Sequence, residues 1–325
     1  MITCKDIARI AGVSTATVTR AFTPHSVIKE DTRQKILKIA EANHYTPNLA
    51  ARSLKQRSSK TVGIILSDVS NPYYVNVVQC IERRLEYHGY RSLVSFADRN
   101  AVSITRALEV MSASRVDGVI IPPEKDLPDT LIKNMQKQGT RFVQLYRNIF
   151  PGIDRVLNNN IYGAYIGTNY FISCGHRRIL FVHRADDVRV AGFWQSVNEN
   201  LGETNQCHAL AFSDNDEMNR AKLAEAFESI KPTAVFAIAH PVGRIVFHYL
   251  WYMGYRIPED ISLLINDNLD WCEMLNISVI EHPYAEIANT ATDLLIERIQ
   301  KNDSAPPQER IITPYIVHRN SIMRI

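Results

Sequence analysis

Long apolar runs are missing from this 325-residue sequence, because none approaches the ~20 residues that cross a membrane. The opening residues, MITCKD, are not a basic segment followed by an apolar stretch, so no secretory signal is recognisable. We therefore expect a cytoplasmic protein without a membrane partner. With 46% hydrophobic and 22% charged residues, the composition is typical of a globular chain with two or three folding units.

Cysteine is scarce and scattered. The five cysteines, Cys4, Cys80, Cys174, Cys207 and Cys272, lie far apart and form no CxxC pair. Their odd number and wide spacing argue against a disulfide framework, and reduced thiols in the cytosol are the simple interpretation. The ten histidines show neither HExxH nor HxH spacing, so we expect no metal site.

Sequence signatures of catalysis are also missing. No GxGxxG follows a strand-like run, and neither GxxxxGK[ST] nor GxSxG occurs. We therefore expect neither an enzyme nor a cofactor. A solute-binding protein of a transporter is a second alternative, but it would need a secretory signal and would have no use for a basic N-terminal segment.

Charge is unevenly distributed along the chain. Residues 1–60 hold 11 Lys and Arg against 4 Asp and Glu, whereas the remaining residues hold 26 against 30. A basic head on a slightly acidic body indicates a polyanionic partner for the head alone. Taken by itself, however, the bias would be better explained as an ordinary solvated surface.

The first 22 residues have the pattern of two short helices joined by a tight turn. Thr3 and Asp6 have the spacing of a capping box, and Gly12 can adopt the left-handed conformation that a sharp turn needs. Ser14 can cap a second helix in which Val18 lies on the apolar side. Helix, glycine turn and capped helix together predict a helix-turn-helix, whose second helix lies in the major groove of DNA.

A third helix is predicted over about Glu30 to Asn43, which completes a small helical headpiece. The segment 45–48, Tyr-Thr-Pro-Asn, ends it, and Asn48 can cap a short helix over Leu49 to Lys55. The polar residues 56–60, QRSSK, indicate a linker. The predicted domains are therefore a headpiece at 1–47, a hinge helix with linker at 48–60, and a body at 61–325.

Strands and helices alternate throughout the body. Amphipathic stretches such as 74–88, 103–114, 219–230 and 244–253 separate short apolar, β-branched runs at 62–66, 92–96, 118–121, 142–145, 179–182, 234–238 and 263–265. This alternation predicts an α/β fold with parallel sheets covered on both faces. Seven such units exceed one sheet, so we expect two similar lobes with a ligand in the cleft between them.

The sequence resembles the lactose-repressor (LacI/GalR) family of bacterial transcription regulators along nearly its whole length. The resemblance rests on segments in collinear order: KDIARIAGVSTATVTRAF, KEDTRQKILKIAEANHYTPNLAARSLK, TVGIILSDVSNPYY, VDGVIIPP, CGHRRILFV, RVAGF, PTAVFA, IPEDISLLIND and HRNS. Each segment alone is weak, but their joint order is specific. The resemblance implies a helix-turn-helix headpiece, a two-lobed body like that of periplasmic sugar-binding proteins, and an effector in the cleft.

In this family the second headpiece helix reads bases, and the matching positions here are Thr15, Ala16 and Arg20. Their chemistry suits the role, since arginine can pair bidentately with guanine and threonine can meet either a polar edge or a thymine methyl. The resemblance also gives phosphate contacts to Ser14, Thr17 and Asn48.

The stretch Leu49 to Lys55 matches the hinge helix of the family, in which a leucine, here Leu54, wedges between base steps in the minor groove. A helix of this length cannot persist alone in water, so its ordering should depend on DNA and on dimerisation. A contact between Leu54 and the body is the alternative. Two headpieces of a homodimer would bind the two halves of a pseudo-palindromic, double-stranded operator.

On the family template, lobe one takes about 61–157 and 285–325, and lobe two takes about 158–284. The family's effector positions map onto Asp68, Asn71, Tyr73, Arg189 and Asp267. Carboxylates and an arginine suit a hydroxylated or anionic small molecule, and an aromatic ring can cover an apolar sugar face. The alternative for each residue is a surface charge or an ion pair that closes the lobes.

Two departures from the family pattern alter this cleft. Ala239-His240 stands where Asn-Asp is usual, and Tyr146 replaces an aspartate before Arg147. With Arg189, these residues would make the cleft more basic and aromatic than a usual sugar site. We therefore expect an anionic effector such as a sugar phosphate or a sugar acid. The whole chain is interpreted as an effector-controlled DNA-binding regulator, and repression is the expected outcome.

Overall fold

The computed structural model describes residues 2–22, 26–46, 58–66, 68–98, 100–124, 126–202, 206–301 and 305–325. The chain divides into two compact units, residues 1–59 and 60–325. Asn48, Leu54 and the predicted hinge helix lie outside the described residues. Within the described ranges, no helix is long and apolar enough to span a membrane.

The N-terminal unit contains three helices, α1 (Cys4–Ala11), α2 (Thr15–Ala21) and α3 (Glu30–Ala42). The capping box is present, because Thr3 Oγ1 accepts from the backbone N–H of Asp6 and an Asp6 carboxylate oxygen accepts from that of Thr3. Gly12 ends α1 with φ +70°, which is the left-handed turn expected of it. The sequence pattern therefore predicts the local structure here correctly.

Two basic side chains of α3 hold the other two helices in place. Lys35 Nζ donates to the carbonyl of Ala11 at 2.9 Å, at the last residue of α1. Arg33 Nη1 donates to the carbonyl of Ala21 at 2.9 Å, at the last residue of α2. A cation at a helix C-terminus is favourable because that end carries unpaired carbonyls and partial negative charge. The small core beneath contains Ile7, Val18 and Ile36.

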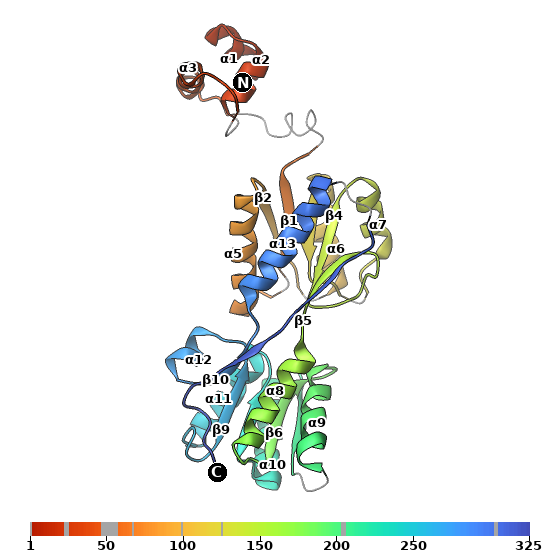
Figure 1. The fold of residues 1–325 in the computed structure, drawn as a ribbon, viewed down its shortest axis with the longest axis vertical. Helices are drawn as coiled ribbons and strands as arrows, with labels where there is room; N and C mark the ends of the chain where they lie inside the picture. Colours follow the sequence, from red (N-terminus) through yellow and green to blue (C-terminus); the bar gives the residue numbers. More distant parts are fainter. Residues whose placement is uncertain are drawn as a thin grey trace. The chain divides into compact units, whose positions relative to one another are not determined.

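Lobe one of the body is a parallel six-stranded sheet in the order β11-β5-β4-β3-β1-β2. The strands are β1 (Thr61–Leu66), β2 (Arg91–Phe96), β3 (Gly118–Ile121), β4 (Arg141–Leu145), β5 (Asp154–Asn158) and β11 (Glu309–Ile312). Helices α5 (Pro72–Tyr87) and α13 (Tyr284–Lys301) lie side by side on one face, as Figure 1 shows. Helices α6 (Ala101–Ala113) and α7 (Asp129–Lys137) cover the other face.

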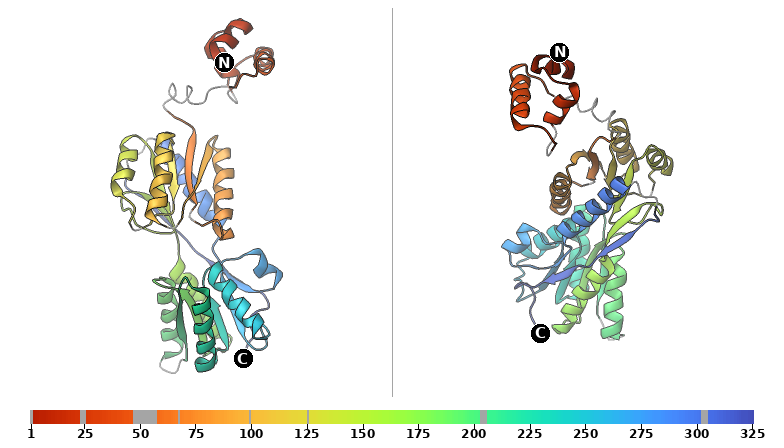
Figure 2. Two further views of the ribbon diagram at one scale, coloured as in Figure 1. Left: turned by 180° about the vertical axis from the view of Figure 1, so that it is seen from behind. Right: turned by 45° about the horizontal axis from the view of Figure 1, so that its top comes forward.

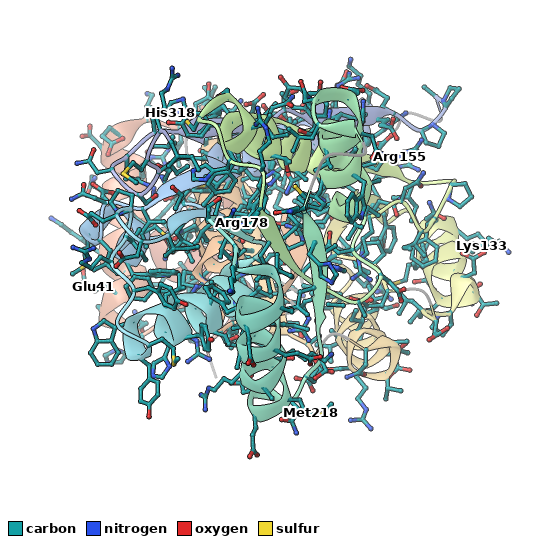
Figure 3. All side chains as sticks on the ribbon, turned by 90° about the horizontal axis from the view of Figure 1, so that it is seen from below. Glu41, Lys133, Arg155, Arg178, Met218 and His318 are labelled. Atoms are coloured by element: carbon teal, nitrogen blue, oxygen red, sulfur yellow. The ribbon has the colours of Figure 1, made fainter. Side chains whose placement is uncertain are left out.

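Lobe two repeats this architecture in the strand order β12-β10-β9-β8-β6-β7, in which only the β10–β12 pair is antiparallel. The strands are β6 (Ile179–Arg184), β7 (His208–Phe212), β8 (Ala234–Ala237), β9 (Ser262–Asn266), β10 (Ser278–Glu281) and β12 (Tyr315–Val317). Helices α8 (Asn160–Ser173) and α9 (Arg189–Asn200) cover one face. Helices α10 (Asp216–Ile230), α11 (His240–Tyr252) and α12 (Asp270–Met274) cover the other, where Met218 projects outward from α10 (Figure 3).

The chain passes three times between the lobes, after β5, after β10 and after β11 (Figures 1 and 2). These three passages are called the crossings. The third crossing corrects the predicted division, because β12 pairs with β10 and the Ile325 N–H donates to the Cys174 carbonyl at 2.9 Å. Residues 315–325 therefore belong to lobe two, although the family template assigned them to lobe one.

Candidate DNA-contacting helix and interlobe cluster

Helix α2 presents one buried and one exposed side. Ser14 Oγ accepts from the Thr17 N–H at 3.1 Å and caps the helix, while Val18 and Ala21 are buried in the headpiece core. The three predicted base-reading residues, Thr15, Ala16 and Arg20, are all exposed. Among the described residues, no ion-pair partner is found for the Arg20 guanidinium. The helix is thus fixed by its apolar side and offers the other side to a partner.

The predicted phosphate contacts Ser14 and Thr17 lie together at the start of α2. Their hydroxyl oxygens are 2.9 Å apart, so one donates to the other. Ser14 is exposed and Thr17 is half-buried. Both can still accept or donate one further hydrogen bond, which suits contacts to phosphate oxygens at a helix N-terminus. The other two predicted DNA contacts, Asn48 and Leu54, lie outside the described residues.

Side chains from both lobes gather at the carboxyl ends of the parallel strands. We call the set of Tyr73, Tyr74 and Tyr146 from lobe one and Asp187, Arg189 and Asp267 from lobe two the interlobe cluster. Its members lie within electrostatic range of one another, since Asp267 and Arg189 both influence the pKa of Tyr73. Strand ends are where ligands of such sheets bind. The structure thus brings together four of the eight predicted effector residues: Tyr73, Tyr146, Arg189 and Asp267.

Arg189 is not a free donor. Its Nε and Nη2 donate to the two carboxylate oxygens of Asp187 at 2.8 and 3.0 Å, a bidentate geometry. Burial opposes ionisation of Asp187, yet the charge of Arg189 and its hydrogen bonds hold the pKa of Asp187 below its usual value.

Arg189 begins α9, which packs closely on α8 because Gly192 has no side chain. A Cβ at Gly192 would lie 2.0 Å from the carbonyl oxygen of Ile161.

Asp267 is a buried acceptor at the end of β9. Burial raises the pKa of Asp267, while the charge of Arg189 and a hydrogen bond from Asn266 oppose that rise. Asn266 Nδ2 donates to Asp267 Oδ1 at 2.9 Å, and the backbone N–H of His240 also favours the carboxylate. Asp267 has φ +85°, an unusual conformation for a residue other than glycine.

Two more strand ends carry the same kind of backbone strain. Tyr146 follows β4 with φ +67°, and Ala239 precedes α11 with φ +67° and ψ +149°, a region that is almost restricted to glycine. Such conformations cost about 1–3 kcal/mol each and cluster where a binding geometry is imposed. One strained residue follows a strand of the lobe-one sheet and two follow strands of the lobe-two sheet, which makes these strand ends the candidate functional site.

The three tyrosines of the cluster form an aromatic wall. Their ring centroids lie 5.4 to 6.0 Å apart in tilted and edge-on arrangements. Tyr73 is buried, and its hydroxyl accepts from Asn158 Nδ2 at 3.2 Å. Tyr146 therefore joins Tyr73 as an apolar surface with polar tips, which suits the face of a ring-shaped ligand.

The other predicted effector residues have local partners. Asn71 caps α5 by accepting from the Tyr73 N–H at 3.1 Å, and Asp68 accepts from the N–H and the hydroxyl of Ser70 at 2.9 and 2.6 Å. Arg147 Nη1 donates to Glu124 at 2.5 Å. These three residues support the loops around the cluster.

His240, the first residue of α11, is hydrogen-bonded to a side chain of α12. Trp271 Nε1 donates to His240 Nδ1 at 3.3 Å. Burial and the charge of Arg244 lower the pKa of His240, while Asp68 from lobe one opposes that change. His240 is therefore neutral near pH 7, and its predicted contribution to a basic cleft is not supported.

Five residues in or beside the cluster were not among the predicted effector residues. They are Tyr74, Asn158, Asp187, Asn266 and His282. Asp187 stands two residues before Arg189, and an acidic residue at that spacing could have suggested an ion pair. His282 follows a strand too short to stand out in the sequence, so its position carried no signal.

Two family models together match almost the whole chain. Residues 3–48 match bacterial regulatory proteins of the lacI family, and residues 59–319 match the periplasmic binding proteins and sugar binding domain of the LacI family. The ribose operon repressor of Haemophilus influenzae is 26% identical over 99% of both chains. The transcriptional repressor PurR of Vibrio vulnificus is 27% identical over the full length of both.

Solved structures show the same fold. A LacI family transcriptional regulator from Enterococcus faecium with bound ribose has a TM-score of 0.72 and 25% identity, covering 82% of this chain and 99% of that one. The Lac repressor dimer bound to operator and the anti-inducer ONPF has a TM-score of 0.81 and 22% identity, covering 99% of each chain. Because one family model alone spans most of the body, the chain belongs to the LacI family and is an effector-controlled, DNA-binding transcription repressor.

Proposed function

We propose that α2 reads the operator through Thr15, Ala16 and Arg20. The observation that carries this assignment is the exposed side of α2, which offers these three side chains while its opposite side is buried. Arg20 supplies the bidentate contact to guanine, Thr15 contacts a base edge or a thymine methyl, and Ala16 makes an apolar contact. Discrimination between operators at one base pair then depends chiefly on Arg20.

Contacts to the DNA backbone fix the register of this helix. Ser14 and Thr17, together at the N-terminus of α2, bind a phosphate, where the helix end favours an anion. Asn48 binds a second phosphate, and Leu54 wedges into the minor groove as the hinge helices of two subunits pair. DNA is the target, so the protein works in the cytoplasm.

The operator-bound form is a homodimer. Lobe two exposes large apolar side chains at the ends of α11 and α12, namely Trp251, Tyr252, Met274 and Leu275. Lobe one exposes Tyr87 and Phe96. Apolar side chains exposed to water gain stability when a partner covers them, and the Lac repressor of similar fold is a dimer on its operator. A second copy of the chain is the proposed occupant.

The effector is a neutral, hydroxyl-rich small molecule such as a sugar. The expectation of an anion depended on Arg147, Arg189 and His240, but both arginines already have carboxylate partners and His240 is neutral. Asp267 and Asp187 instead offer acceptors for hydroxyl groups, and the tyrosines offer a surface for a ring. A relative of the same family binds ribose.

Effector binding controls DNA binding through the lobes. The interlobe cluster contains side chains from both lobes, so a ligand there favours one relative arrangement of them. The strength of the control equals the difference between the effector's affinities for the DNA-competent and the DNA-incompetent arrangements.

Selection from random DNA followed by a gel-shift titration tests the DNA-reading assignment. With the selected duplex, Arg20→Met should weaken binding by about 10- to 100-fold and remove the preference for one base pair, the size of a lost bidentate contact. Arg9→Met is the matched control, since Arg9 is an exposed basic residue of α1 that pairs with Asp6. Equal losses for both variants, or an unchanged base preference for Arg20→Met, would contradict the assignment.

A further inference from the structure

Two buried side-chain atoms stand out within the described ranges because they have no hydrogen-bond partner. They are Asn158 Oδ1 and His282 Nδ1. More than about 90% of buried polar atoms in proteins are paired, so two exceptions in one region need a reason. Both residues lie at crossings between the lobes, Asn158 at the end of β5 and His282 directly after β10.

These two atoms lie beside the interlobe cluster. Asn158 Nδ2 donates to the hydroxyl of Tyr73 at 3.2 Å. His282 Nε2 lies 3.3 Å from Asn266 Oδ1, and the same amide donates to Asp267 at 2.9 Å. The charge of Arg189 also reaches His282. Each unpaired atom is thus one side chain away from a cluster residue.

The three crossings also converge at His282. A Cβ placed on Gly163, near the start of α8 after the first crossing, would lie 3.8 Å from His282 Cε1. The same Cβ would lie 3.2 Å from Cγ of Pro314, which is in the third crossing. His282 itself occupies the second crossing. A ligand bound to His282 therefore touches the point where the lobes join.

The hydrogen-bond chain defines which proton His282 carries. The carboxylate of Asp267 can only accept, so the amide of Asn266 turns its Nδ2 toward it and its Oδ1 toward His282. His282 must then donate from Nε2. Burial lowers the pKa of His282 to about 3, and the charge of Arg189 adds to this, so the ring is neutral. In a neutral ring with a protonated Nε2, Nδ1 is an acceptor.

The open atom of Asn158 is an acceptor as well. Its amide nitrogen is engaged with Tyr73, and the unpaired atom is the carbonyl oxygen Oδ1. The interlobe cluster and the crossings therefore present acceptors that call for hydrogen-bond donors.

We propose that two donor groups of the effector, such as two hydroxyls of a sugar, bind His282 Nδ1 and Asn158 Oδ1. The two residues thereby determine specificity, because a site with a buried acceptor rejects an analogue that lacks the matching donor. This proposal rests on the proposed sugar-type effector. It adds that the effector binds the crossings themselves, so that ligand occupancy and lobe geometry are linked.

A cycle of ligand and protein variants tests the proposal with D-ribose as the probe. Calorimetry compares D-ribose with analogues that each lack one hydroxyl, using the full-length wild type, His282→Leu and His282→Gln. In the wild type, one missing hydroxyl should weaken binding about tenfold, the size of one buried hydrogen bond. In His282→Leu, D-ribose itself should bind about tenfold more weakly, and the same missing hydroxyl should no longer matter. His282→Gln, which keeps an acceptor, should retain the discrimination.

His176→Gln is the matched control. His176 is also a buried histidine of lobe two, but both of its nitrogens are engaged, with Thr233 at 2.9 Å and the Met323 carbonyl at 3.1 Å. This variant should preserve discrimination between D-ribose and its analogues. If the loss of each hydroxyl weakens binding to His282→Leu as much as it weakens binding to the wild type, the missing hydroxyl and the substitution act independently. The proposal is then wrong.

The ligand-free protein provides a second test that does not depend on the effector. Nitrogen NMR of histidine-labelled protein should show His282 with a protonated Nε2 and a bare Nδ1. A proton on Nδ1 overturns the proposal. If the wild type binds neither D-ribose nor D-xylulose nor cellobiose, the proposed effector class fails, whereas the NMR result still decides whether His282 offers an acceptor.

Discussion

Arg189 and Asp187 form an enclosed ion pair at the residue scale, with 17% and 11% of their side chains exposed. The guanidinium keeps its charge at any accessible pH, so the pair depends on the ionisation of the carboxyl. A bidentate partner also holds Arg189 in one orientation, which leaves its remaining N–H groups for a ligand. Asp187 therefore positions Arg189 within the proposed effector site.

Asp187→Asn should destabilise the body in a pH-dependent way. The pKa of Asp187 is lowered in the folded state, so its charge stabilises the fold above the unfolded value of about 3.9. This contribution disappears as the pH falls through the lower folded-state pKa. At pH 7 the free energy of unfolding of the variant should be about 3 kcal/mol below that of the wild type, because Arg189 remains enclosed without this counter-charge. The difference from wild type should shrink toward pH 3.

Urea unfolding at a series of pH values measures this difference. Asp260→Asn serves as the control, since Asp260 pairs with Arg256 at a solvent-exposed site where an ion pair contributes little. If the loss of unfolding free energy in Asp187→Asn stays constant from pH 7 to pH 3, the charge of Asp187 is not the cause of that loss.

Helix α2 illustrates the element scale, because its position depends on a neighbouring helix. Seven residues do not form a stable helix alone, and α2 buries only Val18 and Ala21. The side chain of Arg33 on α3 binds the carbonyl of Ala21, and Lys35 binds that of Ala11. These two contacts connect the ends of α1 and α2 to one support. The orientation of the exposed side of α2 follows from that support.

Arg33→Met and Lys35→Met should each destabilise the headpiece by about 1–2 kcal/mol, since each removes a charged hydrogen bond from a helix end. Operator affinity should fall further than binding to random DNA, because the orientation of α2 matters only for base contacts. Lys38→Met is the control, as Lys38 is an exposed basic residue of the same helix. Thermal unfolding and gel-shift titrations measure the two effects.

Comparable losses for Lys38→Met would mean that charge alone, and not the support of α1 and α2, explains the result. Equal weakening on operator and random DNA by Arg33→Met would likewise contradict a role in orienting α2.

Strand prediction succeeded for the most apolar runs and missed other strands, among them β5, β7 and β10. All seven predicted strands occur, with ends within two residues of the predicted ones. Strand β5 has the sequence DRVLN and contains a buried aspartate, Asp154. An acidic residue is acceptable there only because Arg298 of α13 pairs with it, and that contact spans 144 positions in the sequence. Local hydrophobic patterns hold no information on such a partner.

At the scale of the whole molecule, this same pair joins segments of lobe one that are far apart in the sequence. Arg298 donates to both carboxylate oxygens of Asp154 at 2.8 and 2.9 Å, and both side chains are more than 90% buried. Arg298 also donates to the carbonyl of Pro306 at 2.7 Å, and Asp154 accepts from the N–H of Gln308 at 2.6 Å. The pair thus connects β5, α13 and the segment leading into β11. These are the parts of lobe one next to the crossings.

Arg298→Met should destabilise the body by about 3–5 kcal/mol, because it leaves the charge of Asp154 buried without a counter-charge. The double variant Asp154→Leu with Arg298→Met should recover much of that loss, since it removes both charges. Chemical denaturation of the wild type, of each single variant, Asp154→Leu and Arg298→Met, and of the double variant measures the coupling between the two residues.

Arg84→Met is the comparison, since Arg84 makes a similar bidentate pair with Asp293 on a half-exposed surface. Its effect should be clearly smaller because solvent screens that pair. A double variant that is as unstable as the sum of its parts would contradict the buried-charge explanation.

The sequence by itself determined the organisation of the protein: a helix-turn-helix headpiece, a polar linker near residue 60 and an α/β body. These features follow from caps, turns and apolar periods, which act over a few residues. Only the tertiary structure decided the character of the proposed effector site. It paired Arg147 and Arg189 with carboxylates, assigned the last eleven residues to lobe two, and left His282 and Asn158 as open acceptors. The net charge and donor balance of a site depend on which distant side chains meet, and that is fixed by packing.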